Sequence, residues 1–367
     1  MQSRSRLLAW LAVVTLCCFA IRPSLAQPPT APRPAAPPSL LDAQLSLTAK
    51  YKQALDSLDF AGQQAALREM RQVTAANAAE PKFYTVAELD FMLLDLSRRD
   101  AFTAEQQEAA RQQQSNRGLG MHFAGQGNLA MTIESRRTAL EAAQQLYGDQ
   151  AHATLDAQLL FALSLSESET EPQPDGYPSV QLAQAVLARL ENLRLTDSLQ
   201  YREALRAVMF IHINHRNYPD AAKLGESYLA ACERAQLTAT INYLDGLADV
   251  ANVLNRDQRY AEARDVARKG LNRNFELTRQ NGPSYLNLMH DYAYACIGLQ
   301  DYAKVPQAYD TMLQIADQLP RFPPPRKLEL LTEYQWLLKR TGDQRRLAEI
   351  ERQIAELQTQ LPPREPK

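Results

Sequence analysis

A recurring tyrosine constrains the fold of this chain more than any other feature of its sequence. Four tyrosines are spaced by 41, 42 and 42 residues, and an amphipathic stretch follows each of them: Tyr177, Tyr218, Tyr260 and Tyr302. A period of this length is typical of helical repeat arrays, in which each repeat buries its apolar face only against its neighbours. No segment shows the sustained two-residue alternation of a strand bounded by hairpin turns. The sequence therefore predicts an all-α chain of stacked helical hairpins.

The stretch 247–270 contains one such hairpin. Its first half carries four apolar residues on one face of a 3.6-residue helix: Leu247, Val250, Ala251 and Leu254. Its second half carries small residues behind the repeated tyrosine: Tyr260, Ala263, Ala267 and Gly270. Small side chains let a partner helix come close. The polar residues 255–259 between the two halves predict the turn that joins them.

An earlier copy of the repeat gives the most specific local match to a known family. Leu119 and Gly120, the aromatic Phe123, and then Gly127 before the next helix resemble the tetratricopeptide signature. The 42-residue spacing resembles the longer, kinesin-light-chain-like form of that repeat, and the resemblance covers roughly residues 118–357. It implies a right-handed α-solenoid of antiparallel helical hairpins, and we expect about six or seven of them.

The N-terminus predicts an exported protein. Two arginines precede an apolar run, residues 7–21, and small residues lead to a plausible cleavage point after Ala26. This is the pattern of a secretory signal peptide, which places the protein in the periplasm or outside the cell. An uncleaved anchor is an alternative, although about 15 apolar residues fall short of the ~20 that span a bilayer. A lipid attached to Cys17 or Cys18 is another alternative. The residues before them, Leu16 and Cys17, are poor matches to the small residue that lipoprotein processing requires.

The remaining chain divides by composition. Residues 27–39 contain six prolines and predict an extended, disordered spacer. Residues 40–361 predict one elongated helical repeat domain, and residues 362–367 a frayed tail. A solenoid grows through neighbour contacts, so this length does not require several globular cores.

Charge and cysteine content exclude some classes of function. Removing residues 1–26 takes away three arginines and no acid, so the formal charge changes from −2 to −5. Without a cluster of Lys and Arg, nucleic acid is not an expected partner. Only Cys232 and Cys296 remain, too few for a disulfide framework, and we expect both thiols to be free.

No motif predicts catalysis, a cofactor or a metal site. His212 and His215 are close enough to share a metal, but no third ligand accompanies them, so a structural role is favoured. The loop 167–178 is acidic, but its acids lack the regular spacing of a calcium loop. A glycine cluster follows no strand, and the repeat register accounts for part of it: Gly118, Gly120, Gly125 and Gly127. The sequence therefore predicts a protein that is not an enzyme.

The expected site is a surface. In arrays of this type the first helix of each hairpin lines a concave groove, and the resemblance places eight residues there: Arg206, Phe210, Asp249, Asn252, Arg256, His290, Asp291 and Tyr294. The carboxylate clamp of chaperone-binding tetratricopeptide proteins needs a basic residue where this chain has Ala248, so capture of a peptide C-terminus is not expected. An ordinary solvated surface is the alternative interpretation.

Two functions fit these features. The first is an exported scaffold or adaptor that holds a segment of another protein of the cell envelope in its groove. The second is a ligand-sensing or accessory subunit of a separately encoded envelope enzyme or transport system. Neither requires a membrane span in the mature chain.

Overall fold

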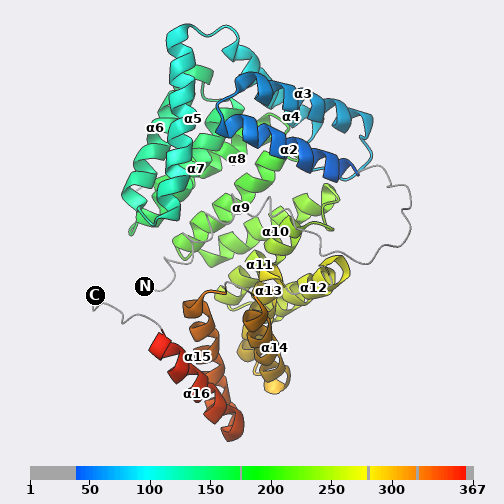
Figure 1. Cartoon of the computed structure of the whole chain (residues 1–367), viewed down its shortest axis with the longest axis vertical. Coiled ribbons are helices and arrows are strands. Elements are labelled where there is room, and N and C mark those ends of the chain that lie inside the picture. Colours follow the sequence, from blue (N-terminus) through cyan, green and yellow to red (C-terminus); the bar gives the residue numbers. More distant parts are fainter. Residues whose placement is uncertain (1–38, 174–175, 279–281, 320–321, 361–367) are drawn as a thin grey trace. The chain divides into compact units, whose positions relative to one another are not determined.

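The computed structural model describes four stretches of the chain: residues 39–173, 176–278, 282–319 and 322–360 (Figure 1). The chain divides into two compact units, residues 1–238 and residues 239–367, called unit 1 and unit 2 below. The predicted signal peptide, the predicted tail and all but one residue of the predicted spacer lie outside the described residues. Those boundaries, and the single repeat domain at 40–361, remain predictions.

Unit 1 holds nine described α-helices: α2 (Leu40–Asp56), α3 (Phe60–Ala76), α4 (Val86–Arg99), α5 (Ala104–Gly125), α6 (Leu129–Tyr147), α7 (His152–Ser168), α8 (Pro178–Asn192), α9 (Leu199–Asn214) and α10 (Tyr218–Arg234). Eight of them pack as hairpins of consecutive helices, as the α2/α3 and α5/α6 pairs in Figure 1 illustrate. The first helices of two successive hairpins, α7 and α9, also pack together. Helix α4 is the exception, because it packs against α3 and α7.

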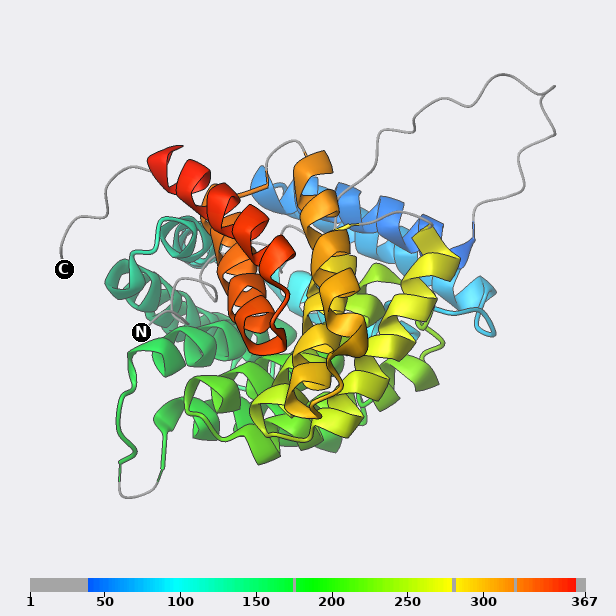
Figure 2. The ribbon, with the colours of Figure 1, turned by 90° about the horizontal axis from the view of Figure 1, so that it is seen from below.

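Unit 2 holds six described α-helices and one short 3₁₀-helix: α11 (Ile241–Arg256), α12 (Tyr260–Thr278), α13 (Pro283–Gly298), η1 (Tyr302–Lys304), α14 (Val305–Gln318), α15 (Pro324–Thr341) and α16 (Gln344–Gln360). They form three hairpins, and Figure 2 shows the last of these, α15 beside α16. The first helices α11 and α13 pack together, as α7 and α9 do in unit 1.

The predicted all-α repeat fold is confirmed. The described residues form seven hairpins and contain no strand, only an isolated bridge between Gln173 and Gly176. Among these helices, none combines the length and the hydropathy needed to cross a bilayer.

The repeated tyrosine marks a repeated turn. In three successive repeats the residue two positions before the tyrosine has a left-handed backbone, with φ of 59°, 62° and 60°: Arg216, Gln258 and Gln300. The following residue then donates its amide to a carbonyl five positions back, over 2.8, 2.9 and 2.9 Å: His212, Leu254 and Cys296. This bond and the left-handed residue together are typical of Schellman helix ends. The 42-residue period is therefore the period of this turn.

The small residues of the hairpin behave as predicted. Ala263 and Ala267 are fully buried. A Cβ added to Gly270 would lie 2.4 Å from Leu288 Cδ2 on α13, closer than two carbon atoms can approach. Glycine at this position therefore lets α12 and α13 come into contact.

We expect two free, slowly reacting thiols in the protein cleaved after Ala26. Cys232 and Cys296 are unpaired and buried, and burial raises the pKa of both thiols. Because the thiolate is the reactive form, a chromogenic disulfide reagent should label the folded protein slowly and both cysteines after unfolding. A monomer that shows no thiol when unfolded without reductant would contradict this prediction.

Candidate ligand-binding cavity

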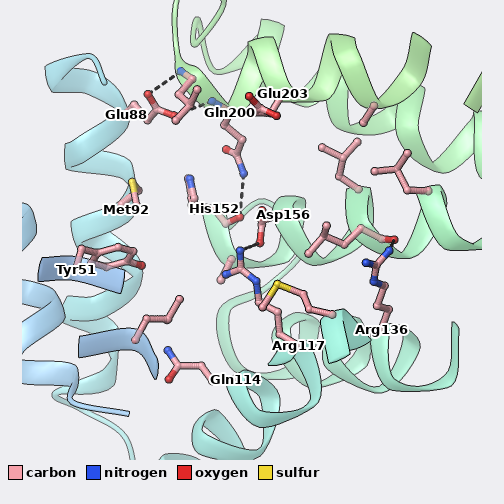
Figure 3. Close-up of a pocket in the computed structure, with 18 of the residues that line it drawn as sticks. Tyr51, Glu88, Met92, Gln114, Arg117, Arg136, His152, Asp156, Gln200 and Glu203 are labelled. Carbon is pink, nitrogen blue, oxygen red and sulfur yellow. Dashed lines mark hydrogen bonds and ion pairs between the residues drawn. The ribbon is translucent and has the colours of Figure 1, made fainter. Parts of the chain in front are cut away.

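Unit 1 contains a cavity of about 360 Å³ (Figure 3). The first helices of three hairpins, α5, α7 and α9, supply most of its wall, and α2, α4, α6 and Tyr84, just before α4, supply the rest. The wall contains arginines and glutamines as well as large apolar or aromatic side chains, such as Tyr51, Met92, Leu159 and Leu163. The volume falls within the roughly 300–1,000 Å³ of ordinary ligand sites.

Helix α4 reaches this wall because two of its carboxylates bind the N-termini of other helices. Glu88 accepts the amides of Leu199 and Gln200, both at 2.8 Å, at the first turn of α9. Asp95, two turns further along α4, accepts the amide of Ala153 at 2.8 Å, at the first turn of α7. The N-terminal end of a helix attracts negative charge and leaves amides without partners inside the helix. Burial nonetheless raises the pKa of both carboxyl groups.

Arginines give the cavity its positive charge. Arg117 Nη2 lies 2.9 Å from Asp156 Oδ2, and Figure 3 shows this pair between Met92 on one side and Arg136 on the other. Arg136 donates through Nη1 to the Leu160 carbonyl at 2.9 Å and to Ser164 Oγ at 2.6 Å. Burial lowers the pKa of Arg136 to about 10, so it remains charged at neutral pH.

His152 contributes no charge to the cavity. Burial lowers the pKa of its imidazole to about 4, so the ring is neutral at pH 7. The rings of Phe91 and His152 meet edge-on, with their centres 5.6 Å apart. The backbone carbonyl of His152 accepts a hydrogen bond from Gln200 Nε2 at 3.1 Å. These contacts make His152 part of the frame between α7 and α9.

Five buried polar atoms on residues of this wall have no hydrogen-bond partner within the described part of the chain: Arg99 Nη1, Gln114 Oε1, Arg117 Nε, Arg136 Nε and Gln200 Oε1. The three nitrogens are donors and the two oxygens are acceptors. A buried polar group left unpaired costs about 1–3 kcal/mol. These five atoms are buried within the wall, so they belong to its packing rather than to the surface that faces the cavity.

Two of the eight predicted groove residues line this cavity. They are Arg206 and Phe210, both on α9, where the Arg206 guanidinium lies 5.9 Å from the centre of the Phe210 ring. The other six belong to unit 2: Asp249, Asn252, Arg256, His290, Asp291 and Tyr294. The predicted contact surface is therefore divided between the two units.

The six residues of unit 2 have different surroundings. Arg256 and Tyr294 are exposed, as predicted. Asp249 and Asp291 are buried, which corrects the expectation that they lie on an open groove. Asn252 is half-buried and donates to Asp291 Oδ1 at 3.1 Å, because α11 and α13 pack closely here.

The remaining predicted residue is also paired. His290 Nε2 lies 2.7 Å from Glu333 Oε2, which joins α13 to α15. Contact of these unit 2 residues with a partner remains a prediction.

The two histidines considered for a metal site have structural surroundings. His212 is buried and bonds to Asn217 Nδ2 through Nδ1 at 3.2 Å. His215 stacks on Tyr177 with ring centres 3.5 Å apart. No group of three or more metal-binding side chains exists among the described residues.

The surroundings of His215 resemble a catalytic triad only in composition. Its Nε2 lies 3.2 Å from Glu169 Oε2 and 3.0 Å from Ser179 Oγ. A triad needs the acid and the serine on different ring nitrogens, whereas here both meet the same one. Ser179 is fully buried and its amide donates to Glu169 Oε1 at 3.0 Å, so this cluster fastens the preceding loop to the start of α8.

Sequence reasoning missed most of the cavity. The register predicted groove residues only from Arg206 onward, whereas α5 already presents a stripe spaced by four residues: Gln113, Arg117 and Met121. That stripe is visible in the sequence. The contributions of Arg99 and Arg136 are not, because their positions on α4 and α6 carry no repeat signature.

Comparison with solved structures supports the fold. The structure is similar to the apo form of RapI, with a TM-score of 0.50 and 11% identity over 87% of this chain and 98% of that one. A Rap protein complexed with Competence and Sporulation Factor gives a TM-score of 0.45, with 11% identity over 88% of this chain and 86% of that one. TPR-like repeats of a putative kinesin light chain from Podosopora anserina give 0.49, with 13% identity over 56% of this chain and 96% of that one.

No protein-family model matches the sequence, and no curated protein matches it. At the identities of the solved structures, the likeness shows the fold alone. That fold is the tetratricopeptide-like helical repeat that the sequence predicted.

Proposed function

We propose that this tetratricopeptide-like repeat protein is an exported, non-catalytic scaffold that binds a segment of another protein of the cell envelope. The observation that carries the proposal is the cavity of unit 1. Most of its wall comes from the first helices α5, α7 and α9, and it combines apolar side chains with arginines and glutamines. A polypeptide offers the complementary set, since every residue other than proline has an amide donor and a carbonyl acceptor.

The polar groups of the cavity suit binding better than chemistry. Catalysis by acid, base or nucleophile needs a reactive group within hydrogen-bond reach of a partner that activates it. Here Asp156 is paired with Arg117, Glu88 is bound to backbone amides, and the pKa of His152, lowered by burial to about 4, makes it a weak base at neutral pH. These groups hold their neighbours in place, which favours a scaffold.

Export is the second part of the proposal and rests on residues 1–26. Their charged start, apolar run and cleavage point after Ala26 have the pattern of a signal peptide. The proposed partner is accordingly a protein of the cell envelope.

Replacing Phe210 with alanine is expected to lower partner capture at least about tenfold, because aromatic contacts dominate many interfaces. The tagged, full-length mature protein is incubated with envelope extract, and bound proteins are quantified by mass spectrometry. The melting temperature should fall by only a few degrees, since Phe210 is partly exposed. The matched variant carries Arg256→Ala and Tyr294→Ala, which remove two exposed side chains of unit 2.

The two variants separate the possible contact surfaces. Loss of the same bound protein with Phe210→Ala alone supports the cavity of unit 1. Loss with the unit 2 variant alone would move the contact to α11 and α13. Retention of the bound protein by both variants would exclude both surfaces as the contact, whereas capture of no protein by the parent would refute the proposed binding role.

The size of the cavity also favours a second function, a ligand-sensing accessory subunit. About 360 Å³ accommodates a small molecule as well as part of a peptide. Native mass spectrometry of the purified protein distinguishes the two, because a sensing subunit should carry or bind a small ligand stoichiometrically. A scaffold should retain only peptide.

A further inference from the structure

The surface that faces the cavity of unit 1 is mostly apolar. Seven large apolar or aromatic side chains line it while remaining half-buried, so each keeps part of its surface uncovered: Tyr51, Leu55, Tyr84, Met121, Leu160, Leu199 and Phe210. They come from four helices, α2, α5, α7 and α9, and from the residue just before α4. Uncovered apolar side chains that gather at one place, rather than standing singly, mark a binding site.

The arginines of the wall are held by the protein itself. Arg99 Nε donates to the Tyr147 hydroxyl at 2.5 Å, and Arg136 Nη1 donates to the Leu160 carbonyl and to a serine. Both arginines, like Arg206, are at most 8% exposed. The fourth, Arg117, is paired with Asp156. A carboxylate that entered the cavity would lose its water without gaining a free guanidinium partner, which is unfavourable.

The acids of the wall do not favour a cation either. Glu88 is committed to two amides at the start of α9, and Asp156 to Arg117. Glu203 is half-buried, but the four arginines of the wall outnumber its three acids, and their charge opposes the approach of a cation. An uncharged occupant therefore matches the cavity best.

The volume of the cavity indicates how large an apolar group it holds. An engineered apolar cavity of about 150 Å³ in another protein binds benzene, so about 360 Å³ has room for about two groups of that size. Met92 and Met121 lie in the same wall as Tyr51 and Phe210. Methionine side chains adapt to the shape of an occupant and make favourable contacts with aromatic rings. Two large apolar side chains, aromatic ones included, therefore fit.

We propose that the cavity of unit 1 binds two large apolar side chains, such as Phe, Leu or Met, of an otherwise uncharged protein segment. Burial of these side chains supplies the affinity, and Met121 on α5 and Phe210 on α9 are among the groups that cover them. This inference rests on the proposed scaffold function and names the chemistry of the segment that the scaffold selects.

The test uses an immobilised pool of randomised nonapeptides, acetylated at the N-terminus and amidated at the C-terminus so that the ends carry no charge. The mature protein is incubated with the pool, and the retained sequences are determined. Each of two large apolar residues should raise retention at least about tenfold over Ala at the same position, equivalent to about 1.4 kcal/mol. Retention should resist sodium chloride, which screens ion pairs, and should strengthen in ammonium sulfate, which favours apolar burial.

Two positions on α5 locate the preference. Met121→Glu places a charge in the apolar wall and should abolish the preference, because Met121 lines the cavity and is half-buried. Leu119→Glu is the matched control and should keep the preference, since Leu119 is 41% exposed on the same helix and absent from the wall. If Met121→Glu does not fold by circular dichroism, Met121→Gln is polar but uncharged and should lower the preference severalfold.

The outcomes separate this inference from the function on which it rests. Retention of peptides without an apolar preference, or with a preference for charged residues, would overturn the inference and leave the scaffold proposal standing. An apolar preference that persists in the Met121 variants would overturn the site. A small apolar molecule that copurifies stoichiometrically and blocks peptide retention would also overturn the inference. Retention of no peptide would overturn it as well, and if no protein is captured from envelope extract either, the scaffold proposal falls with it.

Discussion

Replacement of Glu88 by alanine is expected to destabilise unit 1 by about 2–6 kcal/mol. The change removes the acceptor of two amides at the start of α9, and each buried donor left unpaired costs about 1–3 kcal/mol. The remaining first-turn amide of α9, that of Tyr201, is capped separately by Ser198 and should not be affected. Urea denaturation followed by circular dichroism measures the loss.

Two further variants calibrate this result. Glu88→Gln keeps one acceptor oxygen and should lose about half as much stability. Glu134→Ala removes an exposed carboxylate that pairs with Arg137 on the surface of α6, and should change stability by less than about 0.5 kcal/mol. A Glu88→Ala protein as stable as the Glu134→Ala protein would show that this carboxylate does not hold α4 against α9.

Replacement of Asp291 by asparagine is expected to stabilise unit 2 at neutral pH. Asp291 is 4% exposed, and burial raises the pKa of its carboxyl group from 3.8 to about 6, against the opposing effects of His290 and hydrogen bonds from Asn252 and Asn255. The folded state then binds the proton more tightly than the unfolded state. The contribution of Asp291 to stability is therefore greatest below about pH 4 and is lost as the pH rises through about 6. The shift corresponds to about 3 kcal/mol.

Asparagine removes this penalty and keeps an acceptor oxygen for Asn252. The Asp291→Asn protein should exceed the parent by about 1–3 kcal/mol at pH 7.5, and the two should converge near pH 4. Denaturation midpoints at both pH values measure the difference, and Asp265→Asn, at an exposed position on α12, is the control. A variant less stable than the parent at pH 7.5 would show that Asp291 is held as a carboxylate by its hydrogen bonds.

Local pattern determined the helices and the turns between them. The spacing of apolar and small residues fixes which face of each helix is buried, as at Ala263 and Ala267. The tyrosine period fixes where each hairpin turns, because a left-handed residue two positions earlier and an amide bond to a carbonyl five positions back involve only neighbours in the chain. Such features depend on a few consecutive residues, so the sequence alone predicts them.

Tertiary structure decided the site. Glu88 lies 111 residues before Leu199, whose amide it accepts at the start of α9. No periodicity in the sequence relates the two positions. Arg136 likewise enters the cavity from a second helix of a hairpin, under Gly120 of α5, where an added Cβ would lie 2.9 Å from its side chain. Asp291 was expected on an open groove, yet it is buried where α13 packs against α11. The repeat pattern specifies which neighbours each helix contacts. The burial of a polar side chain depends on every helix that surrounds it. Helix α4 contacts α7 and α9, which lie far along the chain, so its buried carboxylates could not be predicted from the repeat.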